Sequence, residues 1–314
     1  MIGNFNGKHI LHGNQFTKED LGQVMKAAGV FEGGLKNGQT YDLMRGRILA
    51  TLFFEPSTRT RLSFESAMLR LGGGVISVAS GATSSAAKGE SIGDTARTVS
   101  QYADVIVMRH PQIGSAAEAA ATATVPVINA GDGAGQHPTQ ALLDIYTMQK
   151  EVGTLDGIRV ALLGDLKNGR TVHALVELMA LFKVELILVS PPQLQMPAEI
   201  VDGLKKKGLS VHQTDDLMQA AAAADVLYVT RIQKERFSDA ADYEKLKGSY
   251  VIDNHLLEQA KKDLVILHPL PRVDEIAVEV DAHPGAAYFR QTLNGVYVRM
   301  ALLALVLGRT GEVI

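Results

Sequence analysis

The sequence predicts an α/β protein with two doubly wound parallel-sheet domains and a C-terminal helix that returns to the first domain. A chain of 314 residues is longer than a single core usually supports. Short apolar runs alternate with helix-period segments along the chain, which is typical of βαβ units. This alternation restarts near Gly153, where a long helix ends. We therefore expect a first domain at 1–151 with 292–314, and a second at 152–291.

In the first domain, each expected strand is followed by an expected helix. Thr17 with Asp20 three residues later predicts a helix N-terminus ahead of 21–28. Short apolar runs predict the strands, because buried parallel strands are apolar on both faces. The expected strands are 48–54, 75–78, 105–108 and 127–129, and the further helices are 58–71, 93–102, 116–123 and 138–151.

The second domain repeats the alternation with the same signals. The expected strands are 159–163, 185–189, 210–212, 226–229, a weaker one at 250–252, and 265–268. The expected helices are 171–182, 198–207, 217–224 and the closing 291–307. Because parallel strands point the same way, the segments that follow them gather at one edge of each sheet.

Composition narrows the class of protein. Hydrophobic residues make up 46% of the chain and charged residues 21%, as in globular proteins. The net charge of −3 argues against nucleic-acid or membrane-surface binding. The absence of cysteine excludes disulfides and thiolate chemistry. No N-terminal apolar segment resembles a signal peptide, and we expect a cytoplasmic enzyme.

The most informative segment runs from Phe53 to Arg61, between an expected strand and an expected helix. Ser57, Thr58 and Thr60 supply hydroxyls, and Arg59 supplies a guanidinium. A helix N-terminus attracts anions through its free N–H groups and its dipole, so the segment suits a phosphate. The alternative is an ordinary N-cap with surface arginines, which each residue alone would fit.

A second polar segment opens the helix at 138–151. His137 precedes Pro138 and follows the glycine-rich stretch 130–135. A neutral histidine there could donate a hydrogen bond to a carbonyl oxygen, and Gln140 offers an amide one turn later. Alone, His137 is more simply explained as a structural histidine.

Four more polar segments follow expected strands, and none is specific alone. Arg109 follows 105–108, and Arg170 ends the loop 164–170, which lacks the glycine fingerprint of dinucleotide-binding folds. Arg231 opens a charged run that could equally be a solvated surface. In the last segment, 268–272, two prolines predict an open turn whose carbonyls could accept hydrogen bonds from an NH₂ group.

Six polar segments thus follow strands, which predicts one crevice at the strand carboxyl ends. Its positive charge suits a substrate pair with several negative charges. No Asp, Glu or His cluster has metal-ligand spacing in the sequence. We therefore expect catalysis by positioning and electrostatics, with no metal and no cofactor.

Together these segments resemble the aspartate/ornithine transcarbamoylase superfamily, and most closely its aspartate-specific members. The resemblance spans residues 16–309 and rests on Phe-Glu-Pro-Ser-Thr-Arg-Thr-Arg at 54–61 and His-Pro-Thr-Gln at 137–140. Leu270 stands where the ornithine enzymes carry a cysteine. Arg170, with Arg231 and Gln233, also suggests an aspartate substrate.

The resemblance implies a role for each site residue. Carbamoyl phosphate is held through its phosphate by Ser57, Thr58, Arg59 and Thr60. Its carbonyl oxygen is polarised by Thr60, Arg109 and His137. Its NH₂ group contacts Gln140 and the backbone carbonyls of Leu270 and Pro271. Aspartate is held by Arg170, Arg231 and Gln233. Glu55 pairs with Arg170 and Arg236 when the domains close.

The resemblance also implies a homotrimer with shared active sites. Ser84 and Lys88 match a loop that enters the site of a neighbouring chain. A single Lys88 stands before Gly89 where some members of the family carry two lysines. Whether regulatory or other pathway subunits bind this chain stays open.

Three alternatives to aspartate transcarbamoylation remain at this stage. One is a transcarbamoylase for another amino acceptor, which acceptor kinetics would distinguish. Another is a catalytically silent scaffold, which the intact set of site residues argues against. The third, a dinucleotide-binding oxidoreductase, lacks the glycine fingerprint.

Overall fold

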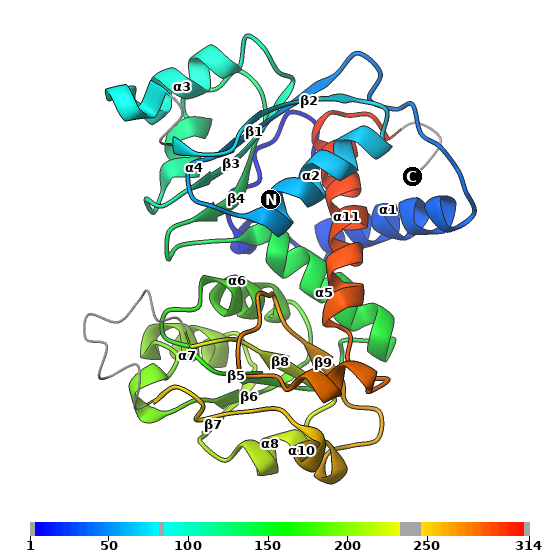
Figure 1. Cartoon of the computed structure of the whole chain (residues 1–314), viewed down its shortest axis with the longest axis vertical. Coiled ribbons are helices and arrows are strands. Elements are labelled where there is room, and N and C mark those ends of the chain that lie inside the picture. The colour runs from blue at the N-terminus through cyan, green and yellow to red at the C-terminus, as the bar shows by residue number, and fades with distance from the viewer. Residues whose placement is uncertain (1–3, 82–84, 233–245, 311–314) are drawn as a thin grey trace. The chain divides into compact units, whose positions relative to one another are not determined.

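The computed structural model describes residues 4–81, 85–232 and 246–310. The chain forms two compact units, one of residues 1–143 with 292–314 and the other of residues 144–291. Each unit has a parallel sheet with helices packed against it (Figure 1). This agrees with the predicted fold class. Among the described residues, no helix has both the length and the apolar character needed to cross a membrane.

The first unit is built on a four-stranded parallel sheet of order β2-β1-β3-β4. Its core includes Ala96 and Ala119, which pack with Leu52 and Ile106 of the sheet. The elements of this unit are η1 (Gly13–Gln15), α1 (Lys18–Lys36), β1 (Ile48–Phe53), α2 (Thr58–Arg70), β2 (Gly74–Val78), η3 (Ser85–Lys88), α3 (Ile92–Val99), β3 (Val105–His110), α4 (Ser115–Ala120) and β4 (Val127–Asp132).

The second unit is built on a five-stranded parallel sheet of order β7-β6-β5-β8-β9. In its core, Leu163 and Leu227 of the sheet pack with Ala220 and Leu256 of two helices. Its elements are β5 (Arg159–Leu163), α6 (Arg170–Met179), β6 (Glu185–Val189), η4 (Pro192–Leu194), α7 (Ala198–Lys206), β7 (Ser210–Thr214), α8 (Leu217–Ala223), β8 (Val226–Val229), α10 (Asn254–Gln259), β9 (Val265–Leu267) and η6 (Val278–Ala282).

Two helices have residues in both units. Helix α5 (Pro138–Val152) begins in the first unit and ends in the second. Helix α11 (Tyr288–Val306) begins in the second unit and ends in the first. The return of the C-terminal helix to the first unit is the chain path that the sequence predicted.

Three local predictions have clear outcomes. Thr17 caps α1 as expected, and its hydroxyl accepts the Asp20 N–H at 3.1 Å. The weak strand at 250–252 is wrong, because that segment forms only an isolated bridge between Ile252 and Ile276. Strand β3 continues to His110, so Arg109 lies inside the strand that it was expected to follow.

Candidate active site

In both sheets the chain reverses the direction in which it adds strands at a central strand. Strand β1 lies between β2 and β3 in the first sheet, and β5 lies between β6 and β8 in the second. Doubly wound folds bind ligands at such a switch point, because the loops that leave the two strands diverge there. The candidate segments after β1 and β3 share the switch point of the first unit, and those after β5 and β8 share that of the second.

The turn between β1 and α2 contains the predicted phosphate-binding residues. Ser57 is the N-cap of α2, yet its side chain makes no capping hydrogen bond to the helix. Thr58 and Arg59 are exposed on the first turn, whereas Thr60 is buried. Because the cap residue does not occupy the first N–H groups, the dipole and the hydroxyls of this turn can serve an anion.

Arg109 lies beside this turn because β1 and β3 pair in parallel. Phe53 is the register partner of Arg109, so the guanidinium emerges next to the Phe54–Ser57 turn. Its Nε donates to Glu55 Oε1 at 3.1 Å, and its Nη2 donates to the same oxygen. This ion pair within the first unit was not predicted. The expected partner Arg236 lies outside the described residues.

His137 occupies the N-cap position of α5, as its place before Pro138 indicated. Its carbonyl oxygen accepts the N–H groups of Gln140 at 3.0 Å and Ala141 at 3.3 Å. The side chains of His137 and Gln140 are both buried. Burial on the first turn of a long helix places a ring nitrogen and an amide where a small polar ligand could meet them.

The glycine-rich stretch before His137 is required by packing between loops. Gly133 has a φ of 55°, and a Cβ there would lie 2.3 Å from the carbonyl oxygen of Pro111. Its N–H donates to the His110 carbonyl at 2.8 Å. The loops that follow β3 and β4 are thereby held close together.

In the second unit, the loop between β5 and α6 closes on its own carboxylate. Asp165 is fully buried, and its Oδ1 accepts the backbone and side-chain N–H groups of Asn168 at 3.0 and 3.1 Å. The Asn168 donors of this turn are thus used within the loop, unlike the backbone donors of a glycine-rich phosphate loop. Arg170 begins α6 and is partly exposed.

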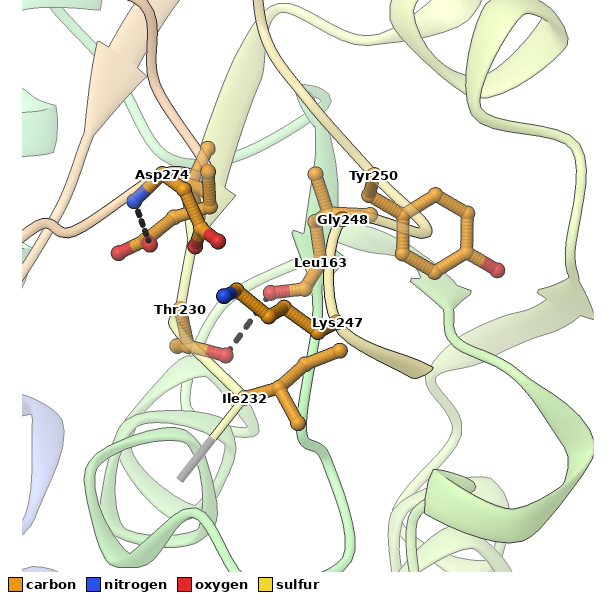
Figure 2. Close-up of a pocket in the computed structure, with 10 residues that line it drawn as sticks. Leu163, Thr230, Ile232, Lys247, Gly248, Tyr250 and Asp274 are labelled. Atoms are coloured by element: carbon orange, nitrogen blue, oxygen red, sulfur yellow. Dashed lines mark hydrogen bonds between the residues drawn. The ribbon is translucent and has the colours of Figure 1, made fainter. Parts of the chain in front are cut away.

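Arg231 follows β8 at the same switch point. The preceding residue, Thr230, donates through Oγ1 to the Leu163 carbonyl at 2.9 Å and ties the ends of β8 and β5 together (Figure 2). A hollow opens beside this contact, lined by Leu163, Gly164, Val229, Thr230, Ile232, Lys247, Gly248, Tyr250, Asp274 and Glu275. Gln233, the predicted partner of Arg231, lies outside the described residues.

The turn after β9 contains the other two predicted contacts, Leu270 and Pro271. Leu270 has a φ of 57°, a left-handed conformation that costs a non-glycine residue roughly 1–2 kcal/mol. The peptide bond between Leu270 and Pro271 is cis. His268 Nδ1 accepts the Leu270 N–H at 2.7 Å and so supports this backbone from within the turn.

His268 is in turn held by Glu275, a residue that was not predicted to belong to the site. Because His268 Nδ1 accepts the Leu270 N–H, Nε2 carries the proton and donates to Glu275 Oε1 at 2.7 Å. Burial raises the pKa of the Glu275 carboxyl, but the interactions with His268 and with backbone N–H groups together outweigh burial, and the pKa is lowered. An acidic residue seven positions after a histidine gives no local signal for this pair.

The last predicted residues lie in the segment between β2 and α3. Lys88 ends the short helix η3 and is exposed. Ser84 lies outside the described residues. Residues Ser85–Lys88 place no large apolar side chain into the core of the first unit, and only Ala86 is partly buried.

Two family models match the chain. The carbamoyl-P binding domain of the aspartate/ornithine carbamoyltransferases matches residues 8–150, and their Asp/Orn binding domain matches residues 156–306. The chain belongs to the aspartate/ornithine carbamoyltransferase family. The sequence resemblance to this family is thereby confirmed.

Relatives and solved structures agree with this assignment. The chain is 57% identical to the aspartate carbamoyltransferase catalytic subunit of Thermococcus onnurineus, over 96% of this chain and 97% of that protein. It is 53% identical to the chloroplastic aspartate carbamoyltransferase of Arabidopsis thaliana, over 95% of this chain and 77% of that protein.

Among solved structures, the aspartate transcarbamoylase of Trypanosoma cruzi in complex with carbamoyl phosphate matches with a TM-score of 0.92 and 44% identity. The match covers 96% of this chain and 97% of that one. The catalytic subunit of M. jannaschii aspartate transcarbamoylase matches with a TM-score of 0.90 and 50% identity, over 97% and 100% of the two chains.

Proposed function

We propose that this chain is an aspartate carbamoyltransferase that transfers the carbamoyl group of carbamoyl phosphate to the amino group of L-aspartate. The products are N-carbamoyl-L-aspartate and phosphate, and the reaction is an early step of pyrimidine biosynthesis. One observation carries the proposal: the side chain of Ser57 leaves the start of α2 uncapped, at the switch point where Arg109 emerges. The 57% identity to a catalytic subunit of this activity supports it.

The residues of the first unit are proposed to bind carbamoyl phosphate. Ser57, Thr58 and Arg59 hold the phosphate at the N-terminus of α2 together with Thr60. Thr60, Arg109 and His137 donate to the carbonyl oxygen. The NH₂ group contacts Gln140 and donates hydrogen bonds to the backbone carbonyls of Leu270 and Pro271. Glu55 accepts hydrogen bonds from the Arg109 guanidinium and so orients it.

The chemistry follows from these positions. The neutral amine of aspartate attacks the carbamoyl carbon, and a C–N bond forms while negative charge develops on the carbonyl oxygen. Donors placed around that oxygen stabilise the transition state without reorganisation. The C–O bond to phosphate then breaks, and the leaving phosphate takes the amine proton. No group on the protein needs to change its protonation state in this sequence.

The residues of the second unit are proposed to bind aspartate. Arg170 and Arg231, with Gln233, pair with the two carboxylates, and an arginine fork suits a carboxylate because both are planar. We propose functional domains of residues 1–151 with 292–314 for carbamoyl phosphate and 152–291 for aspartate.

The activity is tested by a colorimetric assay for ureido products. Purified chain is incubated with carbamoyl phosphate and either L-aspartate or L-ornithine. Carbamoyl aspartate formation with aspartate alone is the expected result. The proposed reaction would be excluded if product formed only with ornithine, or if no product formed with either acceptor.

We also propose a cytoplasmic homotrimer in which Ser84 and Lys88 complete the site of a neighbouring chain. The exposed Lys88 and the small side chains around it support this, because Ser85–Lys88 has little to hold it against its own core. A ring of three identical heterologous contacts closes and yields three shared sites. Regulatory or other pathway subunits could bind in addition.

The shared site is tested by mixing two inactive variants, Lys88→Ala and Arg59→Ala. Dissociation and reassociation of an equal mixture should restore about a quarter of the sites, since each intact half is present with a probability of one half. A mixture that stays inactive although mixed trimers form would show that Lys88 does not act between chains.

A further inference from the structure

A chain of buried hydrogen bonds in the second unit has no part in the chemistry proposed above. Tyr228 of β8 donates its hydroxyl to Asp144 Oδ2 at 2.7 Å. Gln291 of α11 donates through Nε2 to Asp144 Oδ1 at 2.6 Å. The other amide atom, Gln291 Oε1, accepts the backbone N–H of His268 at 3.0 Å. The chain therefore runs from the sheet, through two helices, to the turn after β9.

The burial of this chain argues for positioning. Asp144 and Tyr228 are fully buried, and Gln291 is 1% exposed. Burying polar groups costs free energy even when they are paired, and apolar side chains of similar shape can replace such pairs with little loss of stability. A carboxylate and an amide at this depth define one geometry in a way that apolar packing does not.

Asp144 and Gln291 support the backbone of the turn at 268–271. Gln291 fixes the backbone of His268, and the His268 ring fixes the N–H of Leu270. Leu270 is the only non-glycine residue with a positive φ in the described part of the chain. A backbone in this conformation persists only where its surroundings hold it, so a shift at His268 would turn the Leu270 carbonyl.

We propose that Gln291 and Asp144 are positioning residues for the carbonyls of Leu270 and Pro271, and through them for recognition of the carbamoyl NH₂ group. The proposal rests on the proposed function, which assigns these two carbonyls to that group. It makes a selective prediction. Loss of these buried hydrogen bonds should weaken the binding of ligands that carry the NH₂ group, and should not weaken the binding of ligands that carry only the phosphate or the carbonyl.

Three probes separate these contributions. Carbamoyl phosphate carries the NH₂ group, acetyl phosphate carries a methyl group in its place, and inorganic phosphate lacks both it and the carbonyl. In Gln291→Met the side chain keeps its length but loses both hydrogen bonds. Its dissociation constant for carbamoyl phosphate should rise about tenfold, as expected for weakened hydrogen bonds to one NH₂ group. The dissociation constants for acetyl phosphate and inorganic phosphate should change by less than about twofold, because neither ligand carries the NH₂ group and a twofold change corresponds to a small difference in binding free energy.

An exchange of the two polar groups provides the matched rescue. In Asp144→Asn/Gln291→Glu, the amide at position 144 donates to the carboxylate at position 291. The amide oxygen at 144 still accepts from Tyr228, and the carboxylate at 291 still accepts the N–H of His268. The net charge is unchanged. This double variant should bind all three probes like the wild type, whereas Gln291→Glu alone sets two carboxylates against each other and should lose selectivity for carbamoyl over acetyl phosphate.

Titration calorimetry with thermal unfolding of each protein decides the outcome. A folded Gln291→Met that keeps the wild-type selectivity overturns the proposal, and so does equal weakening of all three probes, which indicates a general structural role. If Gln291→Met does not fold, Tyr228→Phe is measured instead, with a smaller loss of about threefold for one distant hydrogen bond expected and unchanged selectivity overturning the proposal. A wild type that makes no carbamoyl aspartate would refute the proposed function itself. An active wild type with indifferent variants refutes only this inference.

Discussion

Two loops in this molecule occupy equivalent places and differ in what fills them. The Phe54–Ser57 turn follows the central strand of the first sheet and opens α2, and residues 164–169 follow the central strand of the second sheet and open α6. In the first loop, the N-cap side chain leaves the helix start uncapped. In the second, Asp165 fills the turn with its own carboxylate. The same topology thus yields an uncapped helix start in one unit and, in the other, a turn whose donors bond to its own carboxylate.

A switch point provides a location where a ligand can bind, but it does not determine which ligand binds there. In the first unit, Arg59 is exposed on the first turn of the uncapped helix, where we propose that the phosphate binds. The second unit uses its donors internally and presents single arginines, Arg170 and Arg231, which suit carboxylates. Four experiments test this contrast, beginning with the largest expected effect.

Arg59→Ala should remove a guanidinium that is proposed to bind the phosphate at the first turn of α2. We expect a loss of about 10²–10³ in kcat/KM for carbamoyl phosphate, the usual effect of deleting a transition-state donor. Arg70→Ala provides the control, because Arg70 is exposed at the opposite end of the same helix. Steady-state kinetics of both variants decide the question, and near-normal turnover of Arg59→Ala would remove this residue from the site.

Arg231→Lys should weaken aspartate binding in particular. Lysine keeps the charge but loses the planar fork, so we expect the KM for aspartate to rise roughly ten- to a hundredfold. The KM for carbamoyl phosphate is the internal control and should change little. An unchanged KM for aspartate would mean that Arg231 belongs to a solvated charge run, the alternative that the sequence left open.

Gly164→Ala should destabilise the closed turn of the second unit. Gly164 has a φ of 113°, and a Cβ there would lie 2.2 Å from the Thr230 carbonyl oxygen. Gly157 also has a positive φ, of 90°, but a Cβ there meets nothing within 4 Å. Chemical denaturation should show a loss of about 1 kcal/mol for Gly157→Ala from backbone strain alone. The loss for Gly164→Ala should be about 2 kcal/mol larger because of the clash, and equal losses would show that the turn adapts.

Glu275→Gln should change how stability depends on pH. The folded-state pKa of Glu275 is lowered, so its contribution is fully present above its unfolded value near 4.5 and is lost as pH falls through the folded pKa. The free energy of unfolding of the wild type should therefore fall more steeply than that of Glu275→Gln as pH is lowered from about 5.5 to 3.5. Glu279→Gln, at an exposed position, is the control. Parallel curves for wild type and Glu275→Gln would show that the pair with His268 does not couple folding to protonation.

Short stretches of sequence were enough to locate much of the candidate site. The turn at 54–61, proposed to bind an anion, could be recognised because its hydroxyls and arginines are neighbours in the chain between a strand and a helix. His137 was visible because Pro138 marks a helix start. The strand wrongly expected at 250–252 shows the limit of this approach, since an apolar run of three residues is compatible with a loop that packs on the core.

What the sequence alone determined about this protein is local: the order of strands and helices, the caps, and which polar segments follow strands. Only the tertiary structure decided which distant groups meet. Arg109 and Glu55 pair across 54 positions through the parallel register of β1 and β3, and Gln291 and Asp144 pair across 147. The physical reason is that periodicity and capping act within a few residues, whereas these partners are chosen by the packing of whole elements.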